Sequence, residues 1–356
     1  MRDILFLGDS RLDCTELPTQ IKTLLKDASL VSFNCETVID VGGILDEKPI
    51  EKRYPIKTGK TAYRFISFFD NNYIANVANN HSGDYGILGF GETRNFLRKN
   101  MVGGRYTSLR IVRIGELKIA CICATDYGDG KCLNITDTKK IERIITKVNK
   151  YVDRIIIQVH YGFEYVSLPH SNDIKRFHNF IDMGADLVVG HHPHVVLPIE
   201  KYKNGFIAYS LGNFQFGTET RHTNDDYGMI VRYNPIDNDV EYQIVFIDDK
   251  HIPHVLSNKE EEIVRKILDK RGEAIRKIDR LYDIKWYRIA SKIYLSSNFS
   301  SWIYRINKYG IKHFWLCVKC CLSVQYIKMY LGLLLGGFFY VEKSYSEMIK
   351  KNIERM

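Results

Sequence analysis

The sequence lacks both the cysteine spacing of a disulfide framework and the leading segment of a secreted protein. Its eight cysteines show no paired spacing, and the chain begins with an apolar strand-like run instead of a basic region and a long apolar region. Cys317, Cys320 and Cys321 form a Cys-x-x-Cys-Cys arrangement, but no second ligand pair follows at zinc spacing, so no zinc site is predicted. These absences exclude a disulfide-stapled scaffold and predict a reducing, cytoplasmic setting.

The first 250 residues also lack an excess of positive charge. The whole chain has 51 Lys and Arg against 42 Asp and Glu; residues 1–250 hold 31 against 32, a net charge of −1, and residues 251–356 hold 20 against 10, a net charge of +10. A groove that follows a nucleic-acid backbone should be basic, so no nucleic-acid partner is expected. The basic tail predicts contact with an anionic lipid surface or an acidic polymer, and it is equally typical of a solvated helix face.

Long uninterrupted apolar runs are missing as well. The apolar stretch 313–341 is broken by Lys319 and Lys328, and its longest uncharged piece, residues 329–341, has 13 residues, fewer than the roughly 18 that nominate a spanning helix. We therefore expect a helix in the membrane interface, which would place the protein peripherally at the inner face of the membrane. The alternative is a buried helical hairpin packed on the main domain. The aromatic side chains suited to an interface are Trp315, Tyr326, Tyr330 and Tyr340.

Apolar runs of strand length alternate with helix-like stretches over most of the chain. This alternation is typical of α/β architecture with strands buried on both faces. A closing hairpin is predicted over residues 225–249 and one amphipathic helix over residues 263–282. We expect residues 1–250 to form one α/β domain and residues 251–356 a basic, apolar helical region. The strand-like runs are residues 4–7, 30–33, 119–124, 155–159, 187–189 and 206–209, and the helix-like stretches are residues 18–26, 90–99, 139–151 and 173–183.

A histidine-rich block gives the strongest functional signal. The segment Gly190-His191-His192-Pro193-His194 directly follows the apolar run 187–189. Imidazole is the commonest neutral metal ligand, and a tight loop at a strand end can aim two rings at one ion. A lone histidine would more often be structural, but three histidines within four positions favour a metal or phosphate site.

Four other loops place polar side chains directly after an apolar run. Taken singly, such residues are common helix caps and turn formers. Together with the histidine block they supply the mixture of carboxylate, amide and imidazole that a pair of divalent ions requires, at the strand ends where α/β sheets place their sites. The four segments are Gly8-Asp9, Asn34-Cys35-Glu36, Asn79-Asn80-His81-Ser82-Gly83-Asp84 and His160-Tyr161-Gly162-Phe163-Glu164-Tyr165.

These segments, in this order and at these separations, resemble the CapA family of bacterial capsule and poly-γ-glutamate synthesis proteins, within the calcineurin-like metallophosphoesterase superfamily. The resemblance covers about residues 3–250 and is most specific in GHHPHV and IEKYKNGFIAYSLGNFQF. It implies an α/β fold, a four-layer metallophosphatase-like sandwich of two mixed β-sheets flanked by helices. The C-terminal helical region would be appended to this sandwich.

The resemblance also implies roles for individual residues. The implied catalytic residues are His81, as the acid or phosphate contact, with Asp84 and Glu164 as substrate contacts or residues that orient the histidines. His191 is left outside the direct metal ligands. Two divalent ions are implied, and Mn, Fe and Zn are not distinguished. The implied metal ligands are Asp9, Glu36, Asn80, His160, His192 and His194.

Several positions depart from the pattern of the wider superfamily. Its first motif is Asp-x-His, but Ser10 and Arg11 follow Asp9 here. Asn79 replaces a glycine before the amide ligand, and Leu197 replaces a glutamine that often follows the histidine block. One metal instead of two is therefore left open.

Two functions from different classes follow from the resemblance. The first is a metal-dependent hydrolase in capsule, exopolysaccharide or poly-γ-glutamate production, using metal-activated water on a phosphoester or a polymer linkage. Its partner would be an anionic polymer or a phosphoester substrate. The second is a non-catalytic polymer-binding or assembly subunit within a membrane-associated synthase complex. Metal content together with phosphodiesterase activity discriminates between them.

Overall fold

A computed structural model describes residues 3–45, 55–70, 72–104, 107–127, 138–216, 225–278, 280–310, 315, 324–335 and 344–353. Cys132, Cys317, Cys320 and Cys321 lie outside these residues, as does most of the apolar stretch 313–341. The prediction that this stretch holds no zinc site therefore stays a prediction.

The first of two large sheets is mixed and contains the N-terminal strand. Its order is β16-β15-β14-β1-β2-β5-β6, and β13 pairs with the end of β1. Strands β1, β2, β5 and β6 are parallel, whereas β14, β15 and β16 are antiparallel. The predicted closing hairpin is formed by β14 and β15. The bounds are β1 Ile4–Ser10, β2 Leu30–Cys35, β5 Tyr73–Asn76, β6 Met101–Val102, β13 Asn213–Gln215, β14 Tyr227–Asn234, β15 Asp239–Ile247 and β16 Pro253–Val255.

The second large sheet has the order β11-β12-β10-β9-β8-β7. Its four central strands are parallel, and the two edge strands run antiparallel to their neighbours. A separate two-stranded sheet, β3 Val38–Ile39 with β4 Lys57–Thr58, lies beyond the end of β2. The other bounds are β7 Leu109–Ile114, β8 Leu117–Thr125, β9 Arg154–His160, β10 Leu187–His191, β11 Ile199–Tyr202 and β12 Gly205–Ala208.

The alternation of side chains along the strands divides the core into three layers. Ile4 and Phe6 of β1 pack in a cluster with Ile156 of β9, between the two sheets. Leu5 and Leu7 of the same strand face the other way, beneath the first helices. Because successive strand residues point to opposite faces, a strand covered on both sides is apolar at consecutive positions, as residues 4–7 of β1 are.

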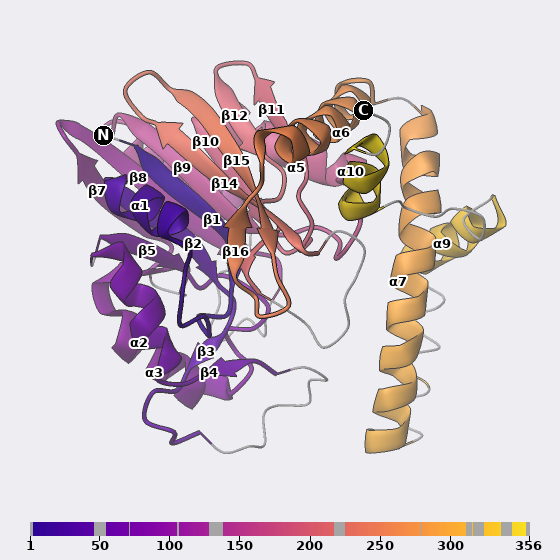
Figure 1. The fold of residues 1–356 in the computed structure, drawn as a ribbon, viewed down its shortest axis with the longest axis horizontal. Coiled ribbons are helices and arrows are strands. Elements are labelled where there is room, and N and C mark those ends of the chain that lie inside the picture. The colour runs from indigo at the N-terminus through magenta and orange to yellow at the C-terminus, as the bar shows by residue number, and fades with distance from the viewer. Residues whose placement is uncertain are drawn as a thin grey trace.

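Helices cover the outer face of each sheet, which completes the four-layer sandwich and confirms the predicted fold class (Figure 1). Helices α1 and α2 contribute to the apolar cluster on the first sheet, α4 and α5 to the cluster on the second, and α3 packs against β3. The bounds are α1 Thr19–Asp27, α2 Thr61–Ile66, α3 Gly86–Leu97, α4 Thr138–Val148 and α5 Ser171–Asp182.

The C-terminal part contains a strand and several helices. The single helix predicted over residues 263–282 is wrong, because α6 ends at Arg276 and Tyr282 belongs to the next helix. Lys277, the C-cap of α6, has φ −110° and ψ 50°, which are not helical values and therefore end α6. The bounds are α6 Asn258–Arg276, α7 Arg280–Tyr309, α9 Val324–Leu334 and α10 Tyr345–Ile353.

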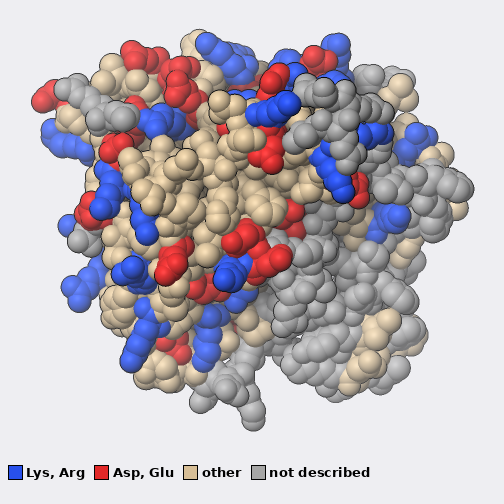
Figure 2. Space-filling model, in the orientation of Figure 1, with Lys and Arg blue, Asp and Glu red and all other residues tan. Residues whose placement is uncertain are grey.

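The described helices and one face of the surface bear on the expectations of a membrane interface and a basic region. Among the helices of the described residues, none is long and apolar enough to cross a membrane. On the face shown in Figure 2, acidic and basic side chains are both spread over the described part without forming a region of one sign.

Candidate metal centre

Parallel pairing brings the five polar loops to one end of the sandwich. In the first sheet Asp9 pairs in register with Asn34, and β2 pairs in parallel with β5, which leads to Asn79. In the second sheet His191 of β10 lies opposite His160 of β9. The carboxyl ends of parallel strands share one edge of a sheet, so the side chains that follow them meet between the two sheets.

Asp9 is fully buried at the end of β1 and is surrounded by nitrogen atoms. Its Oδ1 accepts a hydrogen bond from Asn34 Nδ2 at 2.8 Å and lies 3.3 Å from His191 Nδ1. Its Oδ2 accepts from the backbone N–H of His192 at 3.2 Å. Gly8 makes this placement feasible, because a Cβ there would lie 2.2 Å from the carbonyl oxygen of Gly212.

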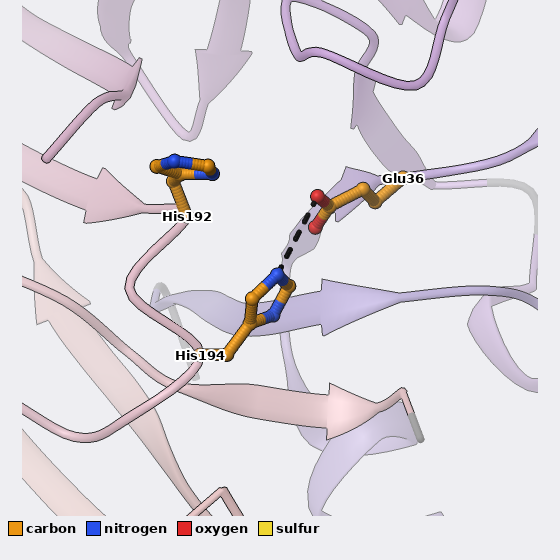
Figure 3. Close-up of side chains that lie close together, drawn as sticks. All are labelled: Glu36, His192 and His194. Carbon is orange, nitrogen blue, oxygen red and sulfur yellow. Dashed lines mark ion pairs between the residues drawn. The ribbon is translucent and has the colours of Figure 1, made fainter. Parts of the chain in front are cut away.

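Glu36 stands at the centre of the cluster. Its Oε1 lies 3.6 Å from His160 Nε2 and 3.7 Å from His194 Nε2. Figure 3 shows the Glu36 carboxylate and the His194 ring directed toward each other, with His192 on the same loop as His194. Two sets of three buried residues each bring one ligand atom per residue within 4.8 Å of the others: Glu36, His192 and His194, and Asp9, Glu36 and His160. The same carboxylate thus belongs to both sets.

Asn80 and His81 close the cluster from the loop after β5. Asn80 Oδ1 lies 2.9 Å from His160 Nε2. His81 Nδ1 lies 2.7 Å from Asp84 Oδ2, which holds the ring so that Nε2 faces Glu36 Oε1 at 3.9 Å. Asp84 therefore orients His81, as a carboxylate next to a functional imidazole commonly does.

His192 and His194 hold unusual backbone conformations in the loop after β10. Their φ angles are 97° and 56°, in the region that non-glycine residues rarely occupy. His194 Nδ1 faces Asn213 Oδ1 at 2.9 Å and Asp9 Oδ2 at 3.2 Å, which leaves Nε2 toward Glu36. Phe216 stacks on the His194 ring with a centroid distance of 4.5 Å. Contacts on several sides hold this strained loop in the conformation that brings a nitrogen of each ring within 4.8 Å of a Glu36 oxygen.

The electrostatics of the cluster suit a cation. Burial and the neighbouring His192 lower the pKa of His160 well below its usual value, so its ring is neutral and keeps a lone pair. Burial opposes a charge on His194, but the nearby Glu36 and Asp9 carboxylates outweigh it and raise the pKa of His194 to about 10. Burial also opposes ionisation of Asp9, but His191 and His194 hold its pKa well below the usual range. The carboxylate field that retains a proton on His194 would equally attract a metal ion.

The structure brings all six side chains predicted as metal ligands to one place. His81 and Asp84 also join them, while Glu164 acts on the cluster through its charge, which helps raise the pKa of His194. The six are Asp9, Glu36, Asn80, His160, His192 and His194.

Three residues of the cluster were not among the predicted site residues. Asn34 Nδ2 contacts Asp9, Glu36 and His160, the last at 3.1 Å from Nδ1. His191 is fully buried, and among the described residues its Nε2 has no hydrogen-bond partner. Asn213 pairs with Asp9 through the backbone and with His194 through its side chain. Asn34 and His191 lie in strand-end segments that the sequence analysis singled out, but neither was given a ligand role. Asn213 lies in the block 199–216, where the short strand β13 shows no periodicity that would indicate a site residue.

The chain is similar to bacterial capsule synthesis proteins. The model of a family described as bacterial capsule synthesis protein PGA_cap matches residues 7–218. The PGA biosynthesis protein CapA of Bacillus subtilis (strain 168) is 31% identical over 205 residues, which cover 52% of this chain and 53% of that protein. The capsule biosynthesis protein CapA of Bacillus anthracis is 31% identical over 185 residues, covering 46% and 44%. The chain therefore spans about half the length of the curated relatives it matches.

Solved structures show lower similarity. A phosphatase from Mycoplasma pneumoniae has a TM-score of 0.44 and 13% identity, covering 71% of this chain and 93% of that one. A 5′-nucleotidase, named as putative, from Staphylococcus aureus has a TM-score of 0.41 and 12% identity, covering 75% and 58%.

Proposed function

The chain belongs to the bacterial capsule synthesis protein PGA_cap family, and we propose that it serves capsule or poly-γ-glutamate production as a metal-dependent hydrolase of a phosphoester or a polymer linkage. The names of the two Bacillus relatives support the pathway. The cluster at the strand ends supports the chemistry. An anionic polymer is the substrate class that is consistent with both the pathway and the hydrolytic chemistry.

The position of Glu36 carries the proposal. Its carboxylate is shared by two sets of potential ligands. One set adds Asp9 of the first sheet and His160 of the second, and the other adds His192 and His194 of the loop after β10. A carboxylate between two ligand sets is the arrangement that lets a protein hold two divalent ions close together. The donor set also fits, since it combines carboxylate oxygens, an amide oxygen and at least one neutral imidazole.

The ligands in this proposal would be the six residues predicted from the sequence, and a bound divalent ion supplies Lewis acidity and lowers the pKa of water. The chain's own groups bind and orient the substrate. His81 Nε2, held toward the cluster by Asp84, would donate a proton to the leaving oxygen. Asn34, through its contacts to Asp9 and Glu36, fixes both carboxylates and prevents their rotation.

The test is metal content and hydrolysis measured on the same preparations. Protein purified with Mn²⁺ would be examined by elemental analysis and assayed with bis(p-nitrophenyl) phosphate and poly-γ-glutamate. We expect metal in stoichiometric amount, and its loss together with activity in Glu36→Gln. The matched control is Glu200→Gln, because Glu200 is also a buried carboxylate beside a histidine, His178 at 3.0 Å, but lies outside the cluster.

The outcomes separate the two functions derived from the sequence. Metal and activity that persist in Glu36→Gln would contradict the assignment of this site. A wild-type protein that takes up no metal and hydrolyses neither substrate would instead favour the polymer-binding or assembly subunit. Loss of metal from both variants would show a general effect of removing a buried charge.

A further inference from the structure

Among the described residues, helix α9 contacts α7 through the face that carries Met329 and Gly332. Met329 is fully buried in a cluster with Trp286 and Ile289 of α7. Gly332, one turn further along, lies so close to α7 that a Cβ there would be 2.6 Å from the carbonyl oxygen of Tyr287. Residues three apart share one face of a helix, so these two positions define the side of α9 that faces the protein.

The other face of α9 is apolar and exposed. Val324, Ile327, Leu331 and Leu334 follow helical spacing, and 70%, 46%, 51% and 76% of each residue's surface is exposed. At about 100° per residue these four side chains fall within one arc of roughly 80°, on the side away from Met329 and Gly332. A surface helix normally presents polar side chains to water, so an aliphatic stripe of this kind indicates a binding face.

Helices α7 and α9 carry an excess of basic side chains. Helix α7 carries six Lys or Arg and α9 carries one, against the single acidic residue Asp283, a net charge of 7 − 1 = +6 over the two helices. Lys285, Arg288, Lys292 and Lys328 are exposed. An aliphatic stripe on a pair of basic helices complements the boundary between anionic lipid headgroups and acyl chains.

We propose that the exposed face of α9 docks this protein peripherally on a membrane that contains anionic lipids. In Figure 1, α9 lies on the far side of α7 from the β-sheets. The segments on either side of α7 and α9 are fixed to the sandwich, because Val264 of α6 and Tyr345 of α10 are both buried in its central cluster. The insertion between them therefore presents the α9 face while the sandwich remains folded.

Vesicle sedimentation of the full chain tests this proposal. The wild type would be compared with Val324→Ser/Ile327→Ser/Leu331→Ser/Leu334→Ser, using phosphatidylcholine vesicles with and without phosphatidylglycerol. We expect binding to the phosphatidylglycerol vesicles and a drop of about tenfold or more in the α9 variant. The matched control is Ile87→Ser/Leu88→Ser on α3, which removes two aliphatic side chains with 75% and 58% of their surface exposed. This control should bind like the wild type.

A second variant, Lys285→Glu/Arg288→Glu/Lys292→Glu, keeps the test decisive if the α9 variant folds poorly by circular dichroism. It should lose the preference for anionic vesicles. No binding by the wild type, or equal binding by all proteins, would overturn the proposal. Concentration-dependent dimerisation of the wild type in sedimentation velocity, lost in the α9 variant without vesicles, would contradict it and assign the face to a second copy of the chain.

Discussion

His192 and His194 show how single residues are used at this site. Both are held at positive φ, which costs on the order of 1–3 kcal/mol each in a non-glycine residue. A loop that needs only to turn would place glycine at these positions. Histidine at both, buried from solvent and with ring nitrogens within 4.8 Å of a Glu36 oxygen, indicates that the rings are needed for ligand chemistry more than for stability.

Replacing His192 should separate stability from metal binding. Both His192→Ala and His192→Gly remove the imidazole and should abolish metal uptake without unfolding the domain. Because only glycine adopts a φ of 97° without strain, His192→Gly should be more stable than His192→Ala by about 1 kcal/mol. Urea unfolding of the two metal-free variants measures this difference. Retention of metal by either variant would contradict the role of His192.

A buried carboxyl outside the cluster provides a pH-dependent prediction. Burial raises the pKa of Asp173, at the start of α5, to about 7, from an ordinary value of 3.8. The protonated carboxyl is therefore favoured by folding. Its stabilisation is fully present below about pH 4 and is lost as the pH rises through about 7.

The variant Asp173→Asn lacks this titration but can still accept the hydrogen bond from the His170 backbone N–H. Between pH 4 and pH 7 the free energy of unfolding of the wild type should fall relative to Asp173→Asn by an amount on the order of a few kcal/mol. Urea unfolding in the presence of a chelator measures the two proteins at each pH. Curves that stay parallel would show that Asp173 titrates normally.

At the scale of the elements, the parallel strands position the side chains of the site at one edge of each sheet. Gly190 illustrates the precision required, because a Cβ there would lie 2.0 Å from the carbonyl oxygen of Tyr209. Gly190→Ala should therefore push β10 away from the neighbouring segment and destabilise the fold by about 3 kcal/mol or more. The control Gly83→Ala meets no atom within 4 Å and should be nearly neutral in thermal unfolding. Equal effects of the two changes would contradict this view of the strand ends.

Much of the arrangement of strands and helices was predictable from the sequence. The buried strands were found because strands covered on both faces are continuously apolar, and the polar residues after them followed from the same pattern. The break between α6 and α7 was not found, because the apolar spacing continues from Ile275 to Tyr282 although the backbone changes direction at Lys277. Asn213 was missed for a related reason, since β13 has only three residues and no period can be read from it.

At the scale of the whole molecule, the C-terminal part is tied to the sandwich at both ends. Tyr345 of α10 is fully buried, and its ring lies 5.1 Å from that of Tyr227 in β14. Val264 and Leu268 of α6 join the same central cluster. A chain shortened near residue 250 would therefore expose part of the core. For this reason the membrane binding of α9 is tested by substitutions and not by truncation.

The proposed function rests on one carboxylate, Glu36, which would organise two metal positions between the sheets. Crystals grown with Mn²⁺ and measured at the manganese absorption edge test it most directly, because the anomalous map shows the ions without reference to activity. We predict two peaks about 3.5–4 Å apart on either side of the Glu36 carboxylate, one beside Asp9 and His160 and the other beside His192 and His194. Crystals that contain Mn²⁺ but show no peak at this cluster, or show peaks held by other residues, would contradict the claim.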